Sequence, residues 1–163
     1  MQLRVIFSLL GQAVRHRPRA FAALGLSSAG ALLSAAAPPG VEVRVAVTGL
    51  RSDRGLVQAC LTADPRAFPD CSRDKAAHTL TVPAAEGMVL DFGRVAPGRY
   101  AISLLHDENG NGRADKTLGL IPREGFGFSH DAPVRMGPPK FAEAAFEVSG
   151  EPAAHTIRMR YLL

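Results

Sequence analysis

Beyond residue 40, apolar and polar residues alternate along the chain with a period of two, the pattern of half-buried β-strands. In segment 41–48, for example, valine occupies every second position from Val41 to Val47. The same period recurs in six further segments, at 57–62, 79–82, 88–92, 99–105, 144–148 and 156–161. No segment after residue 40 keeps a helical period, so the pattern predicts about seven strands.

Glycine and proline separate these segments, and all of them fit within about 125 residues, the size of one domain. The chain after residue 36 is therefore predicted to be all-β, a single two-sheet β-sandwich covering residues 37–163. One connection, between Leu105 and Phe141, is far longer than a hairpin loop. We predict that it is a long loop insertion.

The first part of the chain has the order of a secretory signal. A basic cluster from Arg15 to Arg19 precedes an apolar run at 20–33 and the small residues at 34–37. This order predicts a signal peptide at residues 1–36, cleaved at its end.

A membrane anchor is the alternative to a cleaved signal. The apolar run is shorter, and richer in alanine and glycine, than the roughly 20 strongly apolar residues that span a bilayer. No lipidation site follows it, because the first cysteine is Cys60. Translation from Val14 is an alternative to Met1, since a signal rarely needs an apolar segment before its basic cluster. We expect an exported protein, periplasmic or secreted, without a stable membrane anchor.

The whole-chain charge of +4 gives a misleading picture of the exported protein. Four arginines lie in the predicted signal, and without them 15 basic side chains face 15 acidic ones. A near-neutral chain lacks the basic surface that nucleic acid or anionic lipid requires. We therefore expect neither as a partner.

The chain has two cysteines, Cys60 and Cys71, and an exported protein meets an oxidising compartment. We predict that they pair and clamp residues 64–70 against the strand that carries Cys60. Closing so short a loop contributes about 2–3 kcal/mol. A redox pair and metal thiolates are the alternatives, but there is no C-x-x-C spacing and no nearby histidine set.

The insertion begins with HDENGNGRAD at residues 106–115, which has the oxygen spacing of a calcium loop. The first, third, fifth, seventh and ninth ligand positions would be Asp107, Asn109, Asn111, the main-chain carbonyl of Arg113, and Asp115. Calcium is the one cofactor that the sequence suggests.

Two interpretations of this loop stay open. Leu118 stands where an EF-hand has a bidentate glutamate, so an EF-hand is excluded and calcium would bind weakly. A further oxygen would come from Glu108, Glu124, a main-chain carbonyl or water. Alternatively, aspartate and asparagine side chains hold a ligand-free turn by bonding to their own backbone, with Gly110 and Gly112 allowing left-handed conformations.

Aromatic residues follow on backbone that is flexible or extended, in the stretches GFGF at 125–128 and GPPKF at 137–141. Phe126, Phe128 and Phe141 are the candidates for a surface that binds a protein, peptide or glycan partner. The pattern favours the alternative that they fold back as a lid on the open end of the sandwich, with the two prolines as a stiff strap.

We predict a non-enzymatic domain that binds a partner or acts structurally through the 106–141 insertion. The rival hypothesis is a hydrolase that uses His106, Asp107 and His130, with Glu124 and Asp131 nearby in sequence. No serine or cysteine nucleophile motif and no zinc-ligand spacing supports catalysis.

Three stretches, HDENGNGRAD, GLIPREGFGFS and GPPKFAEAAFEV, together resemble the hallmark of the exported bacterial domain-of-unknown-function 2141 family. The resemblance extends over essentially the whole chain after the signal. It implies an Ig-like or transthyretin-like β-sandwich, in agreement with the predicted strands. It carries over no activity, substrate or catalytic residue.

Overall fold

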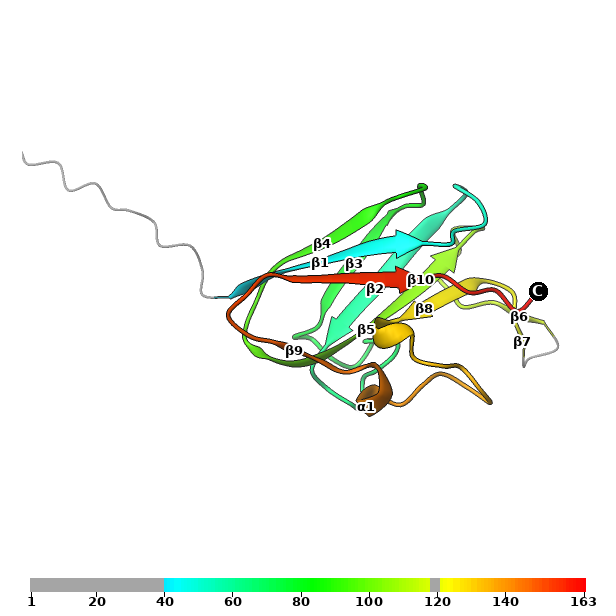
Figure 1. Ribbon diagram of the computed structural model, residues 1–163. Coiled ribbons are helices and arrows are strands. Elements are labelled where there is room, and N and C mark those ends of the chain that lie inside the picture. The colour runs from blue at the N-terminus through cyan, green and yellow to red at the C-terminus, as the bar shows by residue number, and fades with distance from the viewer. Residues whose placement is uncertain (1–39, 118–120) are drawn as a thin grey trace, which may run out of the picture. The chain divides into compact units, whose positions relative to one another are not determined.

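The computed structural model describes residues 40–117 and 121–163, and the regular secondary structure within them is almost entirely strand. The strands form two main sheets, so the predicted all-β fold with two sheets is confirmed (Figure 1). The predicted signal peptide at 1–36 lies outside the described residues.

The first sheet has three strands in the order β10 (Ala153–Arg158), β1 (Val41–Thr48) and β4 (Val89–Val95). The central strand, β1, runs antiparallel to β4 and parallel to β10. Its valines at positions 43, 45 and 47 are at most 1% exposed, because every second side chain points toward the other sheet. The sequence did not indicate the parallel pairing with β10.

The second sheet has four antiparallel strands along its main path. Their order is β3 (His78–Pro83), β2 (Leu56–Thr62), β5 (Gly98–Asp107) and β8 (Gly125–Phe128). A short strand, β9 (Phe146–Val148), pairs with the beginning of β5, whereas β8 pairs with its end. The long strand β5 therefore organises this sheet and carries the chain into the candidate loop.

Short elements complete the second half of the chain. They are the two-residue strands β6 (Lys116–Thr117) and β7 (Ile121–Pro122), the 3-10 turn η1 (Ser129–Asp131) and the one-turn helix α1 (Phe141–Ala144). The predicted strand at 144–148 begins only at Phe146, and the one predicted at 156–161 begins at Ala153 and ends at Arg158.

The main core lies between the two sheets and consists of aliphatic side chains from both. Fully buried aliphatic side chains of this core come from five strands: Val45, Leu61, Leu90, Ile102 and Ile157. Each such side chain contributes about 1.5–3 kcal/mol by leaving water. The alternating pattern in the sequence is thus explained by one hydrophobic layer.

The connection between Leu105 and Phe141 is not one long loop, because β8 returns to the sheet within it. Phe126 also exchanges two backbone hydrogen bonds with Arg160, beyond the end of β10, at 3.0 and 2.8 Å. The glycines of GFGF are spacers of a strand: a Cβ on Gly125 would overlap the Tyr161 ring, and one on Gly127 would lie 2.8 Å from Ile157. Close approach, not flexibility, requires glycine here.

Cys60 on β2 and Cys71 form a disulfide, with their Cα atoms 6.0 Å apart, which confirms the predicted pairing. The segment between them is held by turns, since the amides of Phe68 and Cys71 donate to the carbonyls of Asp64 and Ala67. The disulfide therefore fastens a compact turn segment to β2.

Candidate functional site

The exit of β5 is built around His106, which is fully buried. Its Nδ1 lies 2.7 Å from the Tyr161 hydroxyl and its Nε2 lies 2.8 Å from the carbonyl oxygen of Arg54. Both ring nitrogens are thus engaged inside the protein. His130, the second histidine of the hydrolase hypothesis, is exposed and lies with its ring 6.5 Å from that of Phe146.

Asp107 organises the loop from inside the protein, where its side chain is fully buried. Its Oδ1 accepts the amide of Asn111 at 3.1 Å. Its Oδ2 accepts the amide of Gly112 at 2.7 Å and the Nε2 group of Gln58 at 3.1 Å. A carboxylate has about four lone-pair sites, and besides these three donors the Glu124 carboxyl group lies within hydrogen-bond reach of Asp107.

The other predicted oxygen-bearing side chains meet at one point. The Nδ2 groups of Asn109 and Asn111 both donate to Asp115 Oδ2, at 2.7 and 2.9 Å. The oxygens of the two amides accept backbone N–H groups from Asn111 and Arg113, respectively. The structure therefore brings together the side chains that the sequence pattern selected, and it does so with the hydrogen bonds of an Asx-turn network.

The hairpin of β6 and β7 brings Glu124 to this cluster of side chains, a position that the spacing of the loop residues does not predict. Strands β6 and β7 pair Lys116 with Pro122, and the amide of Arg123 donates to the carbonyl of Asp115 at 2.9 Å. This pairing sets Glu124 beside Asp115, whose amide lies 3.4 Å from Glu124 Oε2.

Glu124 is only 4% exposed, and no hydrogen-bond donor contacts its Oε1. Burial, followed by the negative charges of Asp107 and Asp115, raises the pKa of Glu124 to about 7. The carboxyl group therefore lies in an environment that disfavours its charge.

Glu108, the other acidic side chain considered as an extra ligand, is already engaged. Its Oε2 accepts from the Arg51 guanidinium, with Nε at 3.0 Å, and its Oε1 accepts from the Ser52 hydroxyl at 2.6 Å. Hydrogen bonds from Arg51 hold the pKa of Glu108 down at about 2. Glu108 thus anchors the outside of the loop, whereas Glu124 points to the inside.

Across residues 40–117 and 121–163, no group of three histidine, cysteine, aspartate or glutamate side chains is arranged so that it alone could hold a metal ion. A cation in this loop would therefore need oxygens from asparagine amides or the main chain as well as from carboxylates. Calcium accepts such mixed ligand sets, whereas zinc prefers histidine and cysteine.

The three phenylalanines considered as a partner surface lie in one cluster of apolar side chains, separate from the main core. Phe128 is buried at 7% exposed and packs edge-on against Phe68, which in turn contacts Phe141. Phe126 and Phe141 are half-buried. Of the three rings, these two therefore keep the larger exposed surface.

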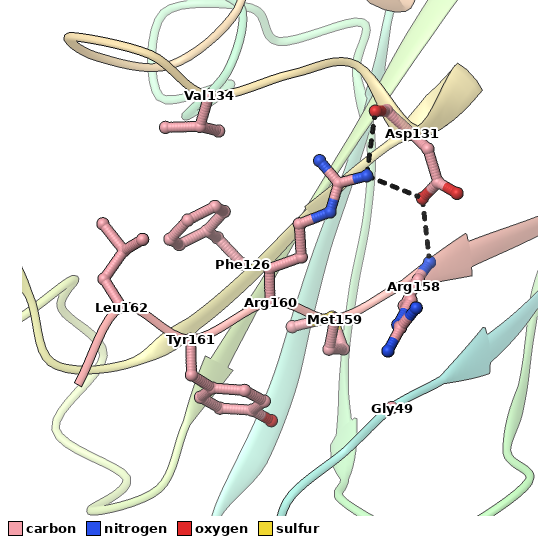
Figure 2. A pocket seen from close by; sticks show the side chains of 9 residues that line it. All are labelled: Gly49, Phe126, Asp131, Val134, Arg158, Met159, Arg160, Tyr161 and Leu162. Carbon is pink, nitrogen blue, oxygen red and sulfur yellow. Dashed lines mark hydrogen bonds and ion pairs between the residues drawn. The ribbon is translucent and has the colours of Figure 1, made fainter.

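A groove of about 610 Å³ lies where the insertion meets the end of the chain. Its lining combines apolar side chains with one carboxylate and two guanidinium groups: Gly49, Phe126, Asp131, Val134, Arg158, Met159, Arg160, Tyr161 and Leu162. Figure 2 shows Arg160 reaching toward Asp131, with Phe126, Val134 and Leu162 on the other side. Arg160 Nη2 donates to the Asp131 carbonyl at 3.1 Å and lies 3.8 Å from its carboxylate.

Sequence reasoning found Phe126 but missed the other groove residues. Arg160 and Leu162 lie at and just beyond the end of the strand predicted at 156–161, and nothing in that pattern indicates a binding site. Asp131 entered the sequence analysis only with His130, in the hydrolase hypothesis. Leu162 is 55% exposed although it is large and apolar, and this exposure is visible only in the structure.

The comparisons with known proteins add a family but no activity. No helix among the described residues is long and apolar enough to cross a membrane. No curated protein and no solved structure matches the chain significantly. A family model does match, over residues 45–156, which is more than half of the chain. The chain therefore belongs to the family described as "Uncharacterized protein conserved in bacteria (DUF2141)".

Proposed function

We propose that this protein is an exported, non-enzymatic binding domain that presents the groove beside its 106–141 insertion to a peptide segment of a protein partner. The observation that carries the proposal is the composition of the groove, which places the apolar surface of Phe126, Val134 and Leu162 next to charged groups. Binding sites combine apolar walls with a few charged or polar groups that fix orientation. The Cys60–Cys71 disulfide and the signal-like N-terminus support export.

The groove chemistry favours peptide over glycan. Glycan sites commonly offer a flat exposed aromatic ring, but this chain has no tryptophan and Phe126 is half-buried. Arg158 and Arg160 outnumber Asp131 among the charged lining residues. A segment with apolar side chains beside an acidic one would therefore complement the groove.

The hydrolase alternative lacks comparable support. A general base must reach the substrate within hydrogen-bond distance, directly or through one water. His106 is enclosed between Tyr161 and the Arg54 carbonyl, with no exposed surface. Its role here is to fix the exit of β5.

Site-specific photo-crosslinking in the producing bacterium tests the proposal. A photoreactive phenylalanine analogue would replace Leu162 in the groove or, as the matched control, Val89 on β4, since these side chains are 55% and 58% exposed. We expect a discrete protein adduct from position 162 and none from position 89. We also expect Arg160→Glu to remove the adduct, because it would repel an acidic partner segment.

Equal labelling at positions 162 and 89, or no adduct at either, would contradict the proposed binding surface. A folded Arg160→Glu variant that keeps the adduct would contradict the acidic partner segment. Circular dichroism of each purified variant separates loss of binding from loss of fold.

A further inference from the structure

The inside of the 106–115 loop contains a carboxyl group whose charge nothing in the surrounding side chains neutralises. Glu124 is 4% exposed and its Oε1 receives no donor. A buried carboxylate is strongly unfavourable unless a cation, a proton or several donors compensate its charge. Glu124 therefore calls for a neutralising group at this place.

The nearest charged neighbours of Glu124 are also acidic, so they increase the need for a group that neutralises its charge. Asp107 and Asp115 are both close enough for their charges to act on Glu124. The groups that bond to the two aspartates are backbone amides and the neutral side chains of Gln58, Asn109 and Asn111. Three carboxyl groups are thus gathered with only neutral donors among these contacts.

We propose that a calcium ion neutralises this cluster, held by the side-chain oxygens of five residues: Asp107, Asn109, Asn111, Asp115 and Glu124. Each of the two asparagine oxygens accepts one backbone N–H and keeps a second lone pair with which to bind the cation, and the cation would replace the two amide donors at the Asp115 oxygen. The Arg113 carbonyl supplies a sixth oxygen.

The ligand chemistry selects calcium over magnesium. Calcium takes six to eight oxygens in flexible arrangements, which suits a loop of carboxylates, amides and a carbonyl. Magnesium demands near-octahedral geometry and keeps several of its waters. The alternative to any cation is a proton shared between Glu124 and Asp107, and the experiment below distinguishes the two.

Thermal unfolding of the mature protein in chelator and in 10 mM calcium chloride tests the site. We expect calcium to raise the melting temperature of the wild type by several degrees, as for a site with a Kd of about 10⁻⁴–10⁻³ M. Glu124→Gln and Asp115→Asn keep the side-chain size and remove one charge each. Both variants should lose the calcium shift.

Glu108→Gln is the matched control, because Glu108 follows Asp107 in the chain but bonds to Arg51 and Ser52 instead of facing the cluster. It should melt at a lower temperature than the wild type and keep the full calcium shift. If Glu124→Gln does not fold, Asp115→Asn decides the result, since its loop position is only partly buried.

A wild-type melt that is the same in chelator and in calcium would overturn the proposal in favour of the shared proton. Equal shifts in the wild type and both folded charge variants would overturn it too. An equal shift with magnesium chloride would contradict the choice of calcium. The cation site and the peptide groove use different side chains, so failure here leaves the crosslinking test unaffected.

Discussion

At the scale of single residues, Gly125 illustrates how a missing side chain permits the fold. A Cβ at this position would overlap the Tyr161 ring, which also bonds to His106. Gly125→Ala should therefore lower the free energy of unfolding by about 1–3 kcal/mol, the usual cost of overpacking a core. Denaturant unfolding of the two proteins measures this difference.

Removing the Tyr161 ring tests whether its overlap with a Cβ at position 125 causes the loss of stability. In a Tyr161→Ala background the ring is gone, so Gly125→Ala should cost much less, with a coupling energy of at least about 1 kcal/mol. The same cost in both backgrounds would show that the backbone of β8, and not the Tyr161 ring, requires glycine.

At the scale of elements, the β6–β7 hairpin brings Glu124 to the loop and gives the cation-free protein a specific pH dependence. The pKa of Glu124 is about 7 in the folded protein against an ordinary value of 4.5. Because the folded pKa is raised, its stabilising contribution is complete below pH 4.5 and is lost as pH rises through 7. The shift corresponds to about 3 kcal/mol.

Melting temperatures measured in chelator between pH 4 and 8 check this dependence. The wild type should lose stability relative to Glu124→Gln over the window from pH 4.5 to 7, because the amide cannot ionise. A constant difference between the two proteins across this range would contradict the buried, negatively flanked environment of Glu124.

The sequence predicted which side chains gather in the candidate loop, but it did not predict that the β6–β7 hairpin brings Glu124 to them. Alternating oxygens at Asp107, Asn109 and Asn111 are a local pattern, and the structure gathers them with Asp115 as the spacing indicates. Glu124 joins them through the pairing of two-residue strands, which leaves no periodic signal. The sequence therefore named it only as one of several sources of a further oxygen.

At the scale of the whole molecule, period-two alternation was enough to predict the core strands. Val45, Leu90 and Ile157 lie in segments where one face is buried, so alternation and burial coincide. Strand β8 escaped prediction because its inward positions are glycines, which carry no hydrophobic signal. The parallel pairing of β10 with β1 depends on chain topology, which local pattern does not encode.

The 106–141 insertion is an integral part of the sandwich. Phe126 and Arg160 exchange backbone hydrogen bonds, and β8 pairs with β5 along Ser103–His106. Both proposed sites depend on this arrangement, since Phe126 lines the groove and Glu124 immediately precedes β8.

Native-state hydrogen exchange at the amides of Phe126 and Arg160 tests this arrangement most directly. Both amides should exchange nearly as slowly as the amide of Val47 on the central strand β1, which donates to the carbonyl of Met88 just before β4. Opening either amide would require unfolding much of the domain. If the amides of Phe126 and Arg160 exchange as fast as those of an exposed loop while Val47 stays protected, the insertion is not part of the folded sandwich and the account is contradicted.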